Sequence, residues 1–155
     1  MRATATAPPD TRQQPQHWPL WYVLPFIAAL PTAPRLARTH VSHALRMWGL
    51  RHFEDDATLF ASELVTNAVQ AATDPAGRPL YISGRLSLIQ VSLFTNRRHL
   101  VICVYDQAPG TPHQQPPDDT AEAGRGLDMI ASLGGWDWHQ AQGGKVVRAF
   151  LETAA

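Results

Sequence analysis

A run of alternating apolar residues, followed closely by a second apolar run, most constrains how this chain can fold. In residues 88–95, Ile89 and the next two alternate positions are apolar, which is the spacing of a strand with one buried face. Asn96 and Arg97 then favour a tight turn, and residues 100–105 form a β-rich apolar run. The two runs predict a hairpin in an antiparallel sheet.

Two segments before this hairpin carry helical spacing. Pro34 suits the first turn of a helix that continues to about Gly49. A second helix is expected from Asp55 or Asp56 to about Ala72, because acidic residues favour a helix N-terminus. The positions that recur at helical spacing are Leu36, His40, Ala44, Met47 and Trp48 in the first helix, and Leu59, Phe60, Leu64, Val65, Ala68 and Val69 in the second.

The last part of the chain predicts one more helix and a second hairpin. We expect the helix over Gly126–Leu133, followed by strands over residues 136–140 and 146–151 that are joined through Gly143 and Gly144. Helices and antiparallel hairpins in one chain fit a mixed α+β fold.

The remaining segments are less regular. Residues 1–17 are rich in Ala, Thr, Pro and Gln and predict a disordered N-terminal arm, which leaves residues 18–155 as one domain. Within the extended segment that follows the arm, the strand is expected over Phe26–Leu30. Residues 79–87 fit either an ordered loop or a short strand. Residues 107–123 predict a long loop that is either functional or mobile, because such loops are uncommon in compact domains.

Charge and composition limit the partners. Thirteen basic and thirteen acidic residues cancel, so nothing favours binding to nucleic acid or to an anionic membrane. The apolar segment Trp18–Leu30 is interrupted by Pro19 and Pro25 and is shorter than the ~20 residues that a spanning helix needs. Cys103 is the only cysteine, which excludes an intrachain disulfide and fits a cytoplasmic protein.

The first polar feature is Glu63 and Asn67 in the second expected helix. Their i, i+4 spacing places both on one helical face, among apolar neighbours. An asparagine carbonyl suits magnesium already held by phosphates, and a nearby glutamate suits a proton acceptor. Spacing alone favours an exposed helix face with two ordinary polar residues.

The second feature is Asp106, which directly follows an apolar strand and precedes the small residues Ala108 and Gly110. A strand-end carboxylate can accept a hydrogen bond from an exocyclic amine, while small residues let the backbone approach a flat ring. A plain strand-to-loop turn has the same residue types.

The third feature is the sequence Gly-Arg-Gly-Leu at residues 124–127, which leads into a helix. Glycine at a helix start exposes backbone N–H groups to an anion, and Arg125 adds a charge-assisted contact to phosphate. The alternative is a loop glycine beside a solvated arginine. Neither the P-loop nor the dinucleotide-binding pattern is present, since Val146 follows Gly144-Lys145 and Met129 stands where a third glycine would be.

Taken in order, these features resemble the N box and the two glycine boxes of the Bergerat-type ATPases, which include gyrase, Hsp90 and the histidine kinases. The stretch Ser62–Val69, the Gly-Arg-Gly-Leu sequence and the closing residues 143–146 are most similar to bacterial anti-sigma factor serine/threonine kinases. The resemblance covers about Phe26–Leu151. It implies a two-layer α+β sandwich with a mixed, mostly antiparallel sheet packed on helices, and it implies ATP and Mg²⁺ as cofactors.

The resemblance also implies roles for individual residues. Asn67 would hold magnesium, Glu63 would be the catalytic base, and Asp106 would bind the adenine amino group beside Ala108 and Gly110. Ala108 stands where relatives usually carry glycine, which is a mild change.

Residues of the second glycine box would wrap the phosphates, and Lys145 would have a structural or phosphate-side role. The box consists of Gly124, Arg125, Gly126 and Leu127.

By this resemblance the chain is expected to bind Mg-ATP and to control a protein partner, such as an anti-sigma antagonist or a sigma factor, with no direct contact to nucleic acid or membrane. Relatives pair through the face made by the first strand and helix, so a homodimer is a further expectation. The other function considered is a non-catalytic nucleotide-binding interaction module of the same fold. The detached catalytic domain of a histidine kinase is disfavoured because no helical hairpin with a phosphoacceptor histidine precedes the domain.

Overall fold

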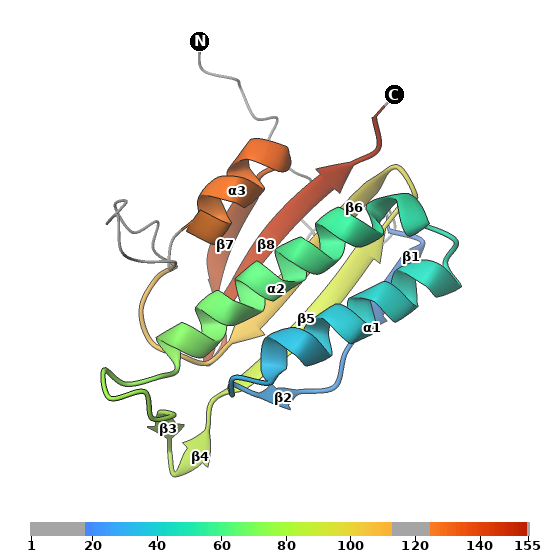
Figure 1. Ribbon diagram of the computed structural model, residues 1–155. Helices are drawn as coiled ribbons and strands as arrows, with labels where there is room; N and C mark the ends of the chain where they lie inside the picture. Colours follow the sequence, from blue (N-terminus) through green and yellow to red (C-terminus); the bar gives the residue numbers. More distant parts are fainter. Residues whose placement is uncertain (1–17, 113–124, 155) are drawn as a thin grey trace.

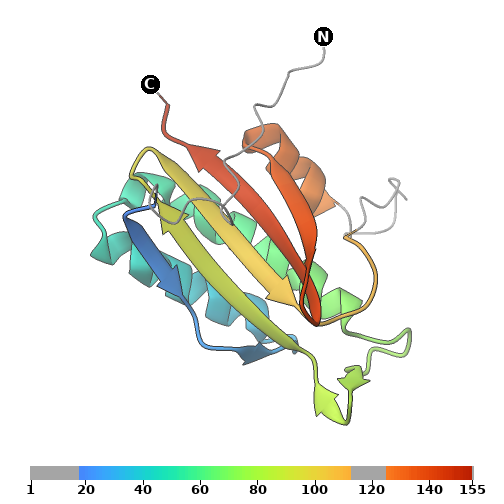
Figure 2. The same ribbon diagram turned by 180° about the vertical axis from the view of Figure 1, so that it is seen from behind.

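Three helices lie on one face of an antiparallel sheet in the computed structural model, which describes residues 18–112 and 125–154 (Figure 1). The helices are α1 (Ala33–Met47), α2 (Glu54–Ala71) and α3 (Arg125–Leu133), with a short 3₁₀ turn η2 (Arg51–Phe53) before α2. Seen from behind, the opposite face of the sheet carries no helix among these residues (Figure 2). The predicted two-layer α+β sandwich is therefore confirmed.

The main sheet has the strand order β1-β5-β6-β8-β7, with β2 also paired to β5, and every pairing in the described ranges is antiparallel. Its strands are β1 (Leu20–Val23), β2 (Ile27–Ala28), β5 (Leu88–Thr95), β6 (His99–Asp106), β7 (Trp136–Ala141) and β8 (Gly144–Glu152). The register aligns Ile89 with Asp106 and Asp106 with Lys145, which sets these residues side by side on three neighbouring strands.

The core lies between the sheet and the helices. The alternation in β5 is confirmed, since Ile89, Val91 and Leu93 are fully buried toward the helix layer. Phe60 of α2 is among the largest fully buried side chains. Within the described ranges, no helix is both long and apolar enough to cross a membrane.

The bounds predicted for α1, α2 and both hairpins agree with the structure to within about two residues, but the buried face of α1 differs from the prediction. Leu36 and Met47 were expected to face the core, whereas they are 44% and 60% exposed. The helix instead buries Ala33, Ala37, Val41, Ala44 and Leu45. Alanine occupies three of these positions because α1 packs closely along α2.

The prediction of a strand over Phe26–Leu30 was also only partly right. Only Ile27–Ala28 forms a strand there, and the longer pairing with β5 is made earlier in the chain by Leu20–Val23. The ambiguous segment 79–87 contains a small hairpin, β3 (Tyr81–Ile82) with β4 (Arg85–Leu86), which projects beyond the end of α2 (Figure 1).

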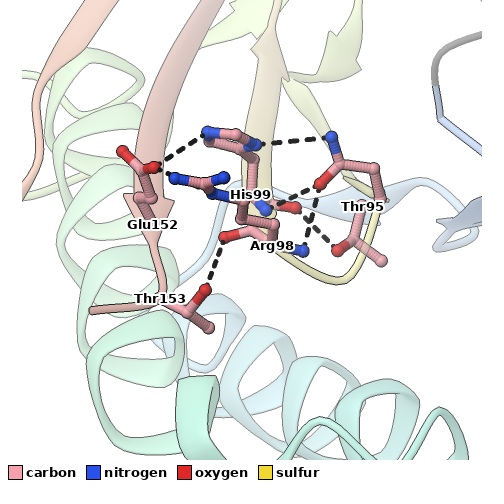
Figure 3. A network of polar contacts seen from close by, with 6 residues as sticks. Thr95, Arg98, His99, Glu152 and Thr153 are labelled. Atoms are coloured by element: carbon pink, nitrogen blue, oxygen red, sulfur yellow. Dashed lines mark hydrogen bonds and ion pairs between the residues drawn. The ribbon is translucent and has the colours of Figure 1, made fainter. Parts of the chain in front are cut away.

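A polar network fixes the turn between β5 and β6 (Figure 3). The Asn96 side-chain oxygen accepts backbone N–H groups from Arg98 and His99 at 3.1 and 2.7 Å, and Thr95 donates its hydroxyl to the His99 carbonyl at 2.7 Å. Arg98 and His99 each lie 3.3 Å from the Glu152 carboxylate at the end of β8. The network holds the β5–β6–β8 register from one end, and Asp106 lies at the other.

Candidate functional site

Helix α2 presents Glu63 and Asn67 one turn apart, both half-buried, with Leu64 and Ala68 beside them in the core. Among the residues that the structure describes, no hydrogen bond or ion pair engages either polar side chain. A carboxylate and an amide that are sheltered but unpartnered are free to take an external ligand.

The start of α3 lies directly against Glu63. A Cβ built on Gly126 would lie 2.2 Å from Oε2 of Glu63 and 3.1 Å from its Cβ. Any side chain at position 126 would therefore displace the carboxylate. This contact brings together two of the predicted features, the helix pair and the glycine-led helix start.

The other three residues of the Gly-Arg-Gly-Leu sequence are less informative. Gly124 and the side chain of Arg125 lie outside the described part of the chain, so their predicted phosphate contacts stay predictions. Leu127 is buried in the core, and only its backbone is available to a ligand.

Asp106 ends β6 with its side chain turned toward the helix layer and only 1% exposed. Its Oδ1 accepts the backbone N–H of Ala108 at 2.9 Å and the ammonium of Lys145 at 2.8 Å. Burial raises the pKa of Asp106 above its ordinary value, while the hydrogen bond and charge of Lys145 oppose that rise. The carboxyl group is thus held in place from two sides.

Lys145 lies beside the strand-end carboxylate because β8 pairs with β6. The ammonium donates to Asp106 and, at 3.1 Å, to the Ala108 carbonyl oxygen. Sequence reasoning missed this pair, although a signal was present. Lys145 shares the alternation of Val147, Ala149 and Leu151, so it had to face the core, and a buried lysine needs a carboxylate.

The backbone around the end of β6 requires glycine at two positions. Gly110 has φ +97°, a left-handed conformation that residues with a side chain rarely adopt. A Cβ on Gly144 would lie 2.0 Å from the Asp106 carbonyl oxygen, so β8 begins in close contact with the end of β6. Both glycines shape the segment that carries Ala108.

Ser87 is a further polar residue that the sequence did not single out. Its hydroxyl oxygen is buried and has no hydrogen-bond partner among the described residues. It lies two residues before Ile89, the β5 neighbour of Asp106, and so faces the same side of the sheet. A buried hydroxyl near Asp106 that lacks a partner among the described residues is suited to a hydrogen bond with water or a ligand.

These groups are arranged around α2. That helix packs on β6, which ends at Asp106, and against α3, which carries Gly126. In the described ranges, no three His, Cys, Asp or Glu side chains gather as a metal cluster, so a divalent ion here would rely on the Asn67 amide and on oxygens of a bound ligand.

A two-layer sandwich with a Glu/Asn helix face, a glycine-led helix start and a strand-end carboxylate has the architecture of the Bergerat-type ATPases. The sequence matches the family model of the histidine kinase-like ATPase domain over residues 27–150, and the chain belongs to this family. The family assigns ATP as the ligand of the fold. No curated protein matches the chain in sequence.

Proposed function

We propose that this chain is an ATP-dependent regulatory protein that transfers phosphate to a serine or threonine of a protein partner, as anti-sigma factor kinases do. The observation that carries the proposal is the carboxylate of Glu63, which lies against Gly126 at the start of α3. This places a proton acceptor next to the helix end at which phosphates are expected to bind.

Magnesium fits the residues of this site. The Asn67 amide is half-buried and unpartnered among the described residues, and it lies one helical turn from Glu63. Asn67 would hold the ion together with phosphate oxygens. When bound, magnesium neutralises charge on the phosphates.

The other residues have separate tasks. Glu63 accepts the proton of the partner hydroxyl group, and Asp106 accepts a hydrogen bond from the adenine amine. Gly124, Arg125 and Gly126 contribute backbone N–H groups and one guanidinium to the phosphates. In this proposal catalysis depends on positioning the reacting groups and on neutralising charge, as phosphoryl transfer generally does.

The proposed partner is a protein, either an antagonist of an anti-sigma factor or a sigma factor, and the setting is the cytoplasm. The balanced formal charge of the chain supports a protein partner over nucleic acid. Pairing of two copies through the face of β1 and α1 is part of the same proposal. Both elements carry an exposed apolar side chain, Trp21 of β1 at 65% and Met47 of α1 at 60%, which supports it.

A transfer assay tests the proposal. The purified protein is incubated with γ-labelled ATP and a candidate antagonist, in parallel with Glu63→Gln, which keeps the shape of the side chain and removes the base. Label on the partner that Glu63→Gln loses, with ATP affinity unchanged, supports the kinase. Tight ATP binding by the unmodified protein with no transfer to any candidate supports the non-catalytic interaction module instead.

A further inference from the structure

Asp106 and Lys145 form an ion pair inside the molecule, at the place where the base of a nucleotide is expected. The two side chains are 2% and 6% exposed, and the ammonium lies 2.8 Å from Oδ1 of the carboxylate. Charges this deeply buried lose most of their hydration, so a pair in this position requires close geometry. The β6–β8 register supplies it by aligning the two residues.

The two oxygens of the Asp106 carboxylate differ in their hydrogen bonds. Oδ1 accepts both the Lys145 ammonium and the Ala108 amide, whereas Oδ2 accepts no hydrogen bond from any described residue. Lys145 also holds the Ala108 carbonyl oxygen. One lysine therefore fixes the carboxylate, fixes the backbone that follows it, and leaves Oδ2 as the acceptor for a ligand.

We propose that Lys145 is a positioning residue for base selection: it keeps Asp106 in the ionised form and leaves Oδ2 to accept the exocyclic amine of adenine. This inference rests on the proposed function, in which Asp106 reads the base. In this proposal Lys145 acts at the base of the nucleotide rather than at its phosphates.

The reason lies in what a buried carboxyl group does without its cation. Burial favours the protonated form, which donates a hydrogen bond where the ionised form accepts one. A donor matches the carbonyl group of guanine instead of the amine of adenine. Removing the charge of Lys145 should therefore weaken the preference for ATP over GTP.

Lys145 is the only charged side chain in the described ranges that acts on the pKa of Asp106. The paired position on β5 is the apolar Ile89. On α2, which packs on β6, the titratable group of the site is Glu63, whose carboxylate lies against Gly126. The pH dependence of base selection should thus follow the Asp106–Lys145 pair.

The test compares four proteins: the unmodified chain, Lys145→Gln, Asp106→Asn and the double variant. Glutamine keeps an N–H donor at position 145 but removes its charge, so the comparison separates charge from hydrogen bonding. ATP and GTP affinities are measured by calorimetry from about pH 5.5 to about pH 8.5, a range wide enough to reveal a single titrating group. Lys145→Met, which lacks both charge and donor, is measured alongside.

The unmodified protein should prefer ATP with little change across this range. Lys145→Gln should lose the preference at low pH and recover ATP affinity by up to about tenfold per pH unit as Asp106 ionises. Both proteins that carry Asp106→Asn should show no such dependence. A structural role for Lys145 would lower ATP and GTP affinity together and leave the pH profile flat.

Lys145→Gln with the selectivity and the flat profile of the unmodified protein would overturn the inference alone. An unmodified protein that binds neither nucleotide would overturn the proposed function and this inference together. Should Lys145→Met fail to unfold cooperatively, Lys145→Gln still decides between these outcomes, because it retains a neutral hydrogen-bond donor at position 145.

Discussion

Oε2 of Glu63 occupies the space that a side chain at position 126 would need. The separation from an added Cβ is 2.2 Å, far inside van der Waals contact, and the Glu63 Cδ atom would lie at 3.0 Å. The glycine therefore lets α3 approach α2 while the carboxylate keeps its place. Glu63 of α2 and the start of α3 thus form one unit.

Gly126→Ala should lower the rate of phosphoryl transfer without unfolding the protein. Alanine is favoured over glycine within a helix by about 1 kcal/mol, and the end of the Glu63 side chain can swing aside, so the protein should stay folded. The displaced carboxylate should cut phosphoryl transfer by about 10²-fold or more, which is typical for loss of a general base. Transfer rate and thermal unfolding midpoint are measured together.

The matched control for this variant is Ser132→Ala, an exposed position of the same helix, which should change neither quantity. If Gly126→Ala transferred phosphate at the unmodified rate, Glu63 would not need its observed position.

Gly144→Ala should instead destabilise the fold. Its Cβ would meet the Asp106 carbonyl oxygen at 2.0 Å and the carbonyl carbon at 2.9 Å, and this backbone cannot rotate away. The forced shift should lower the free energy of unfolding by about 1–3 kcal/mol, as overpacking generally does. Urea unfolding measures the change.

Gly143→Asn serves as the comparison for Gly144→Ala. Gly143 has φ +75°, which asparagine tolerates, and the nearest atom to an added Cβ is the Tyr105 hydroxyl oxygen at 3.3 Å. It should cost clearly less stability. Equal losses in both variants would show that the contact with Asp106 is not the cause.

The sequence was informative where a pattern is local. Alternation at Ile89, Val91 and Leu93 predicted β5 with its bounds, and the proline and acidic signals predicted α1 and α2 to within about two residues. The buried face of α1 was predicted less well, because large residues were expected inside. Close packing against α2 selects Ala33 and Ala37 there, and that depends on a partner helix rather than on local spacing.

The same contrast between local patterns and long-range contacts holds for the site. The identities of Glu63, Asn67 and Asp106 could be proposed from residue type and order along the chain. The contact of Glu63 with Gly126 could not, because it depends on how two helices distant in sequence meet. The Asp106–Lys145 pair depends likewise on the register of two strands that are not adjacent in sequence.

Removal of Lys145 should have a pH-dependent cost in stability. In Lys145→Met the buried Asp106 loses its cation, and breaking a buried pair in this way typically costs about 3–5 kcal/mol at neutral pH. Burial raises the pKa of Asp106 in the folded state above that in the unfolded state, so the folded state binds the proton more tightly. Stability of the variant should therefore increase as pH falls toward the unfolded-state pKa.

Urea unfolding at several pH values checks this sign. Asp106→Asn combined with Lys145→Met should recover part of the loss at neutral pH and remove the pH dependence. A loss of stability that grew as pH fell would contradict the assignment to Asp106.

Cys103 should report unfolding. It is buried on the sheet face that carries no described helix, and burial raises its pKa to about 12. At pH 8 only about one thiol in 10⁴ is then ionised, so a thiol reagent should react far more slowly than with a free cysteine. Labelling with a chromogenic disulfide reagent should follow the urea unfolding curve, and rapid labelling of the folded protein would contradict this burial.

The central claim is that Asn67 and Asp106 serve one Mg-ATP site on this sandwich. Calorimetric titration of ATP, with magnesium and with a chelator, into the unmodified protein, Asn67→Ala and the exposed control Gln70→Ala tests it most directly. The account predicts that ATP binds the unmodified protein and Gln70→Ala with magnesium-enhanced affinity, and that Asn67→Ala loses magnesium-dependent binding. Absence of ATP binding, or the same magnesium enhancement in Asn67→Ala, would contradict it.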